Sequence, residues 1–208
     1  MKKIVFMLFA TAFLYSCGGS GSGAFGGKDA VIPEKFDYTM FSNEVEMKKV
    51  ADDVLAKIGD NISKLDKIDI WLTRPSKEGS IRRNNPDYAM ITASFLDPKD
   101  PKKLFEYRYS SSNGGWDNGQ SKTVKLLTGN VETFVLANEM YDASALTSDM
   151  IVETVQEAWK KYKDEAKYSE QWVRGVVIQK GNMEVSIKGI LAANDLEKSE
   201  RFKKKIGK

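Results

Sequence analysis

The sequence predicts an α+β domain: an antiparallel sheet with amphipathic helices packed on one face. Its predicted elements follow the order helix, several strands, helix, hairpin, helix, which is not the strict alternation of strand and helix that builds a parallel sheet. The connections between successive strands are short, and short connections favour antiparallel pairing. Both halves place a long amphipathic helix before paired strands, which is compatible with a duplicated helix-plus-strands unit, although too few residues are identical to decide this.

The first helix is expected to begin after Asn43 or Ser42, either of which can cap it, and to end near Gly59. Its apolar residues recur at steps of three and four, which is the period of a helix with one buried face. These residues are Met47, Val50, Val54, Leu55, Ile58, Ile62 and Leu65.

Strands are expected where the period changes to two. The expected ranges are 68–72, 88–96, 104–110, 121–127 and 131–136. In the third of these, Phe105, Tyr107 and Tyr109 share one face, which is more typical of the core side of a strand than of a stacking platform for a ligand. The Asn- and Gly-rich stretch 111–119 predicts a hairpin connection.

The second half predicts a helix over 148–166 with Ser148 as its cap, followed by a hairpin of strands 172–179 and 183–191. A last helix is expected from Asn194, because Asn194-Asp195-Leu196-Glu197 resembles a capping box. Several cations lie in this final stretch, and they suit either the negative end of a solvated helix, which we favour, or contact with anionic lipid. They are Lys198, Arg201, Lys203, Lys204, Lys205 and Lys208.

The loop around Trp116 is the most site-like stretch, because a flat aromatic ring is flanked by the hydrogen-bonding residues Asn113, Asp117 and Asn118. These four residues are the candidate ligand-binding residues, and sugar rings are bound in this way. The competing and favoured interpretation is that Trp116 folds back over the edge of the sheet in an ordinary hairpin. The stretch lacks the spaced acidic ladder of a calcium loop.

The composition excludes several kinds of site. The chain has no histidine and one cysteine, so a Ser-His-Asp site and the usual zinc sites are excluded. We therefore name no catalytic residue and expect no metal and no cofactor. Removing residues 1–16 takes away Lys2 and Lys3 and lowers the formal net charge from +3 to +1, which gives no reason to expect nucleic acid as a partner.

The first seventeen residues have the parts of a secretory signal: two lysines, an apolar run over 4–14, and a small residue before the boundary. Leu14-Tyr15-Ser16-Cys17 resembles the lipobox of bacterial lipoprotein precursors. The resemblance covers 1–17 only, and it implies cleavage before Cys17 and attachment of fatty acids such as palmitate to that residue. Glycine after the cysteine then fits delivery to the outer membrane, with the domain facing either the periplasm or the outside.

These features predict three parts: a signal peptide over 1–16, a lipidated cysteine with a flexible Gly/Ser tether over 17–27, and a single α+β domain over 28–208. The expected function is a non-catalytic binding or interaction module of the cell envelope, held at the membrane by its lipid and recognising a protein or glycan partner. One alternative is a glycan hydrolase, which needs two facing carboxylates about 5 to 9.5 Å apart. The other is an envelope assembly factor, which needs an open sheet edge.

Overall fold

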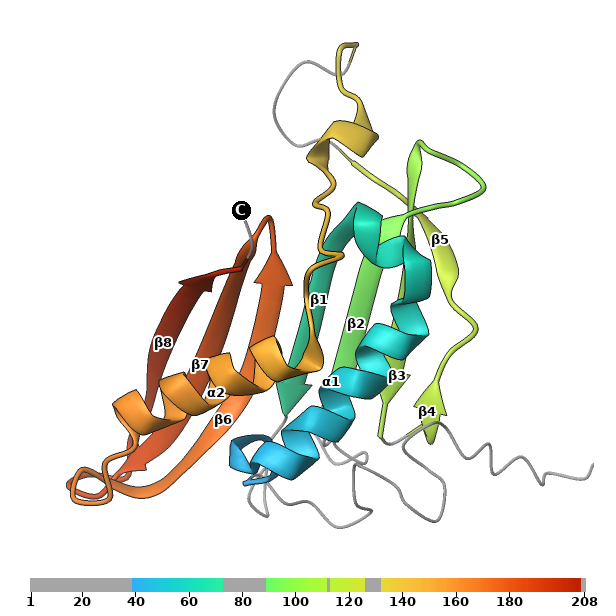
Figure 1. Ribbon diagram of the computed structural model, residues 1–208. Helices are drawn as coiled ribbons and strands as arrows, with labels where there is room; N and C mark the ends of the chain where they lie inside the picture. The colour runs from blue at the N-terminus through green and yellow to red at the C-terminus, as the bar shows by residue number, and fades with distance from the viewer. Residues whose placement is uncertain (1–38, 73–88, 112, 126–131, 207–208) are drawn as a thin grey trace, which may run out of the picture.

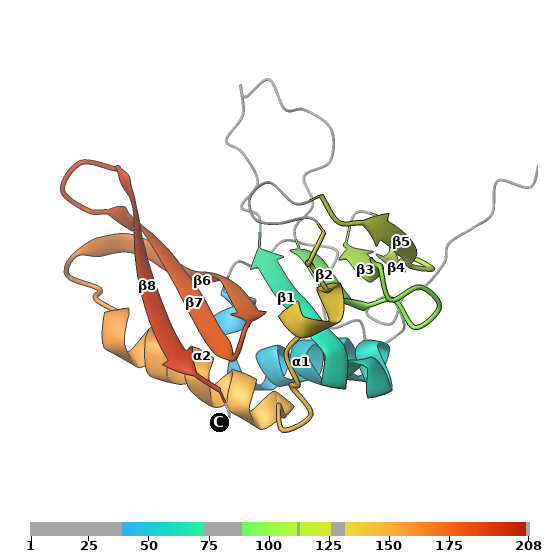
Figure 2. The ribbon, with the colours of Figure 1, turned by 90° about the horizontal axis from the view of Figure 1, so that it is seen from above.

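The computed structural model describes residues 39–72, 89–111, 113–125 and 132–206. These residues form one antiparallel sheet of eight strands, and both α-helices lie on the same side of it (Figures 1 and 2). The predicted α+β architecture, with an antiparallel sheet and helices on one face, is therefore confirmed.

The strands follow the spatial order β4-β3-β2-β1-β6-β7-β8, and β5 also pairs with β3. The helices are α1 (Glu44–Ile58) and α2 (Ser148–Tyr162), with short 3-10 helices η1 (Met40–Ser42), η2 (Gly59–Lys64) and η3 (Leu136–Glu139). The strands are β1 (Leu65–Leu72), β2 (Ala89–Leu96), β3 (Lys103–Ser110), β4 (Gly115–Trp116), β5 (Gln120–Thr123), β6 (Tyr168–Gln179), β7 (Asn182–Leu191) and β8 (Glu197–Lys205).

One unit occurs twice along the chain. The first copy is α1 followed by β1, β2 and β3, and the second is α2 followed by β6, β7 and β8. The first strands of the two copies, β1 and β6, pair antiparallel at the centre of the sheet, with Ile68 opposite Ile178 and Ile70 opposite Val176. The two units therefore share one continuous sheet and one apolar core.

Helix α1 begins and ends where its local chemistry requires. The Asn43 side chain accepts hydrogen bonds from the backbone N–H groups of Val45 and Glu46, which otherwise lack partners in the first turn. Gly59 ends the helix with φ of 57°, a conformation that glycine adopts without a steric cost. Both boundaries agree with the expectation from the sequence.

Helix α2 differs slightly from the prediction. Thr147 rather than Ser148 is the N-cap, and its hydroxyl accepts a hydrogen bond from the backbone N–H of Met150. The helix ends at Tyr162, before the predicted residue 166, because Gln171 of β6 binds the carbonyl of Tyr162 and the backbone N–H of Asp164. Contacts with β6 therefore end this helix.

Alternate residues of the strands point toward the helices. Ile68, Ile70 and Leu72 of β1 are buried on that side, as are Ile91 and Phe95 of β2. The predicted face of β3 is confirmed, since Phe105 and Tyr107 pack against this core and Tyr109 is buried in it. We call the other side of the sheet the open face, because none of the described helices covers it (Figure 2).

The predicted last helix is wrong, because 197–205 is the edge strand β8. The residues interpreted as a capping box form the turn between β7 and β8: Asp195 has φ of 57°, and the Asn194 side chain accepts a hydrogen bond from the backbone N–H of Leu196. Asn and Asp serve turns as readily as helix caps. Pairing of Val185 with Phe202 then attaches the segment to the sheet.

Two strand predictions also need correction. The described part of the predicted strand 131–136 forms a turn and the start of η3, and it pairs with no other described strand. The predicted strand 121–127 is shorter than expected, because β5 ends at Thr123. The predicted signal peptide, Cys17 and tether lie outside the described residues, as does Lys208. Every helix that the structure describes falls short of the length and apolar character of a membrane span.

Candidate functional site

The register of the sheet aligns polar and apolar side chains of the open face into rows that run across the strands. One row joins Asp69 of β1, Thr92 of β2 and Arg108 of β3. The neighbouring row joins Trp71, Met90 and Ser110 on the same three strands. Since adjacent strands lie about 4.8 Å apart, each row places three side chains within about 10 Å.

These rows line a pocket of about 820 Å³ on the open face. The hairpin after β3 forms one wall of the pocket, through Asn113, Gly115, Trp116 and Asp117. The volume is in the range of small-molecule sites, and the mixture of apolar surface with a few polar groups is typical of them. Met90 is 42% exposed, so part of the apolar lining is open to solvent.

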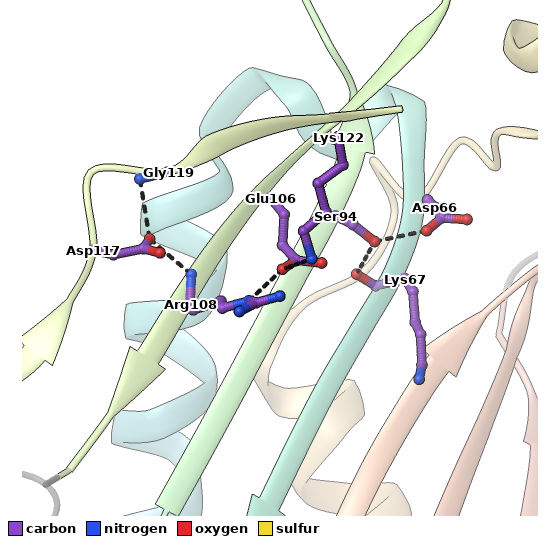
Figure 3. Close-up of polar contacts among 8 residues, drawn as sticks. All are labelled: Asp66, Lys67, Ser94, Glu106, Arg108, Asp117, Gly119 and Lys122. Atoms are coloured by element: carbon purple, nitrogen blue, oxygen red, sulfur yellow. Dashed lines mark hydrogen bonds and ion pairs between the residues drawn. The ribbon is translucent and has the colours of Figure 1, made fainter. Parts of the chain in front are cut away.

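Glu106 anchors the polar side of the pocket (Figure 3). It is only 8% exposed, and its carboxylate accepts hydrogen bonds from Arg108 Nε and Lys122 Nζ. Burial alone would raise the pKa of Glu106, but these two cationic donors outweigh it and hold the pKa below its ordinary value. Glu106 is therefore ionised near neutral pH and serves to position Arg108.

Asp69 is the other acidic residue near the base of the pocket. Its Oδ2 accepts a hydrogen bond from Lys67 Nζ at 2.5 Å, whereas its Oδ1 is buried and has no hydrogen-bond partner. A buried acceptor left without a partner costs about 1–3 kcal/mol. A hydrogen-bond donor that reached this oxygen from a ligand or a water molecule would recover that cost.

Trp71 supplies the aromatic surface of the pocket. The Arg174 guanidinium lies 4.8 Å from the centre of its ring, a cation–π contact. Gly175 is opposite Trp71 in the neighbouring strand, and a Cβ built there would lie 3.1 Å from the indole ring and 2.5 Å from the carbonyl oxygen of Ile70. Glycine at 175 therefore lets the indole lie close over the backbone of β6.

Asp117 fixes the irregular stretch between β4 and β5, which pair with successive parts of β3 (Figure 3). Its Oδ1 accepts hydrogen bonds from the backbone N–H groups of Arg108 and Gly119, at 2.9 and 3.0 Å. Gly119 has φ of 75°, and a Cβ there would come within 2.3 Å of the Phe105 ring. The Asp117-Asn118-Gly119 triplet thus has a structural role in shaping the pocket wall, and no cluster suited to a metal ion occurs among the described residues.

Trp116 folds back toward α1, as the favoured interpretation of the sequence expected. Its Nε1 donates a hydrogen bond of 2.6 Å to Asp53 of α1, and its ring meets Tyr109 edge-on at 5.6 Å. Burial raises the pKa of Asp53, while the Trp116 hydrogen bond and the nearby Lys57 oppose that shift. Trp116 therefore fastens the hairpin to the helix layer and also contributes to the pocket lining.

The structure brings together three of the four residues that the sequence singled out. Trp116, Asn113 and Asp117 line the pocket, whereas Asn118 is exposed and does not line it. Ligand binding by these residues stays a prediction. Asp69, Trp71 and Thr92 also line the pocket, but the sequence pattern did not single them out as site residues. Their period-two alternation was visible, but the register that places them beside Arg108 was not.

The chemistry of the pocket suits binding better than hydrolysis. It contains three carboxylates, and each is already engaged: Asp69 with Lys67, Glu106 with two cations, and Asp117 with backbone N–H groups. A general acid needs a carboxyl group that stays protonated near neutral pH, and Glu106 has the opposite shift. The described carboxyl group with a raised pKa, Asp53, lies outside the pocket lining.

Comparison with known proteins identifies no relative: no protein-family model matches the chain, and neither a curated protein nor a solved structure matches it.

Proposed function

We propose that the protein is a cell-envelope lipoprotein, anchored in the outer membrane through Cys17, whose α+β domain binds a ligand on the open face of its sheet without chemical conversion. The observation that carries the binding role is the pocket of about 820 Å³ between Asp69, Trp71, Met90 and Arg108. The anchor is proposed from the lipobox-like sequence at 14–17. The outer membrane is proposed from the glycine that follows the cysteine.

The pocket favours a ligand that combines an apolar surface with hydrogen-bonding groups. Trp71 and Met90 offer apolar contact, Thr92 offers a hydroxyl group, and the guanidinium of Arg108 is fixed through Nε by Glu106. Glycans and short peptides of the envelope have this mixed character. The pocket gives no reason to propose a reaction, because its buried carboxylate, Glu106, is held ionised by Arg108 and Lys122.

Binding can be tested with an array of envelope and dietary glycans together with cell-wall peptides, using two variants that make the same chemical change. Met90→Lys places a charged side chain in the pocket. The control, Val45→Lys, places the same charged side chain on α1, at a 61% exposed residue that does not line the pocket. We expect a ligand that binds the wild type and the Val45→Lys variant but not the Met90→Lys variant. Equal binding by both variants, or none by the wild type, would contradict the pocket as the site.

The anchor needs a separate test, because it is proposed from the sequence alone. Mass spectrometry of the mature protein should find acyl chains on Cys17 as the first residue, and fractionation should place the protein in the outer membrane. The Cys17→Ala variant should lose both properties. An unmodified N-terminus on a soluble wild-type protein would contradict the lipoprotein proposal and leave the pocket proposal unaffected.

A further inference from the structure

The edge strand β8 carries the larger part of its unbalanced positive charge on one face. Its residues alternate between the helix side and the open face, because side chains of a strand point alternately to its two sides. The register places Arg201, Lys203 and Lys205 on the open face, opposite Ser186, Glu184 and Asn182 of β7. In the predicted helix Arg201 and Lys205 would have shared one face and Lys203 would have lain on the opposite side, whereas the strand aligns all three in one line.

Each cation on the helix side of β8 lies beside a carboxylate. Lys198 Nζ lies 3.1 Å from Glu200, and Lys204 Nζ lies 2.6 Å from Glu157 of α2. Glu200 also accepts a hydrogen bond from the Tyr168 hydroxyl group and lies 3.3 Å from Lys167. With Lys167 included, the helix side of the strand has three cations against two carboxylates, an excess of one positive charge.

The open face of the same strand is not balanced. Arg201 and Lys203 share a single carboxylate, that of Glu184, at 3.6 and 3.0 Å. Both side chains are 70% exposed, and Lys205 forms no ion pair with any part of the chain that the structure describes. With the Lys188–Glu197 pair included, the open face of β7 and β8 carries four cations against two carboxylates.

Protection of a sheet edge explains only part of this pattern. Lysine is common on edge strands because it discourages pairing with other chains, and β8 is an outermost strand (Figure 1). That role requires charge along the edge but does not require the uncompensated charges to lie on one face. A line of exposed cations beside a broad sheet face fits a flat anionic surface.

We propose that the open face of β8, defined by Arg201, Lys203 and Lys205, docks on an anionic membrane surface. Each basic residue near such a surface strengthens binding by about fivefold, and Glu184 reduces the effect of the first two. A lipid anchor would hold the strand close to the membrane and raise its effective concentration there. The docking contact itself needs no anchor, so it can fail or succeed independently of lipidation.

The test measures cosedimentation of the full chain carrying Cys17→Ser with vesicles of phosphatidylcholine alone or mixed with phosphatidylglycerol. Two double variants each remove two charges from β8: Lys203→Gln with Lys205→Gln on the open face, and Lys198→Gln with Lys204→Gln on the helix side. Residues 1–38, including Cys17→Ser, are the same in the parent and in both double variants. Their contribution to vesicle binding therefore cancels when the variants are compared with the parent. Circular dichroism melting checks that each variant is folded.

We expect the parent protein to bind the anionic vesicles more tightly than the neutral ones. The open-face double should weaken that binding by about fivefold or more, and the helix-side double by less than about twofold. Raising the salt concentration should abolish the difference between vesicles, because the attraction is screened. Equal binding to both kinds of vesicle, or equal losses in the two doubles, would overturn the proposal, and so would binding to an acidic protein without binding to vesicles.

Discussion

The two helix-plus-three-strand units differ at the outer edges of the sheet. In the first unit, β4 and β5 pair with β3, and the aromatic residues Tyr107 and Trp116 pack beside Lys57 of α1. In the second unit, β8 is a free edge among the strands that the structure describes, and cations are abundant on it. The same unit can therefore protect its edge either by added chain and aromatic packing or by charge.

The consequence for function differs as well. The added chain after β3 in the first unit forms a wall that turns the sheet face into a pocket, and the three carboxylates of that pocket are held by ion pairs or by backbone N–H groups. The described part of the second unit has no such wall, and its open face carries four cations against two carboxylates. The pocket suits a small ligand, whereas the exposed row of cations suits an extended anionic surface.

The largest effect is expected from the core, and it tests whether the two units form one cooperative body. Met47 and Ile151 are the fourth residues of α1 and α2, and both are fully buried. Truncating either to alanine should cost about 2–5 kcal/mol of unfolding free energy. Urea unfolding should remain a single transition for both variants. A separate early transition of one unit would contradict the shared core.

A smaller effect is expected at ion pairs, and here the units should differ. Glu106→Gln leaves Arg108 and Lys122 without their buried partner and should cost about 1–3 kcal/mol. Glu157→Gln breaks the exposed pair with Lys204 and should cost less than about 1 kcal/mol. Chemical denaturation of the two variants under the same conditions measures the difference.

The effect of Glu106 should depend on pH in a known direction. Its folded pKa is below the ordinary value of 4.5, so its stabilisation is complete above that pH and is lost as the pH falls through the folded pKa. The gap between wild type and Glu106→Gln should therefore close in acid. A gap that stayed constant down to about pH 2 would show that the carboxylate charge is not its source.

Asp53 should show the opposite dependence. Its folded pKa is above the ordinary value of 3.8, so its contribution is present below that pH and is lost as the pH rises through the folded pKa. Asp53→Asn keeps an acceptor for Trp116 Nε1 and removes the charge. The unfolding free energy of the variant minus that of wild type should therefore rise as the pH goes from about 3 to about 7. Thermal melts of both proteins at the two pH values measure the sign of this change.

The smallest change in stability is expected at the free edge. Arg201→Val with Lys203→Val should alter the unfolding free energy by less than about 0.5 kcal/mol, because both side chains are largely exposed. The same change should promote association of the protein through β8, since it removes the charges that discourage edge pairing. Light scattering during concentration measures this. A fully monomeric variant would indicate that charge is not what protects this edge.

The sequence predicted those features that depend on neighbouring residues. The Asn43 cap and Gly59 stop of α1, the alternating aromatics of β3 and the hairpin at Lys180-Gly181-Asn182 are all local patterns, and the structure has them. The exclusion of histidine-dependent chemistry also followed from composition alone. Local hydrogen bonds and side-chain periodicity are encoded within a few residues, so a single sequence is enough to read them.

Other features were decided by distant partners. The stretch 197–205 has charges and a start that suit a helix, yet it is a strand because β7 offers an unpaired edge to which Phe202 and its neighbours can bind. The pocket likewise exists only because the register sets Asp69, Thr92 and Arg108 side by side on three strands. By itself the sequence determined the elements that form within a few residues, while the tertiary structure decided the edge strand and the site, because backbone pairing joins residues that are far apart along the chain.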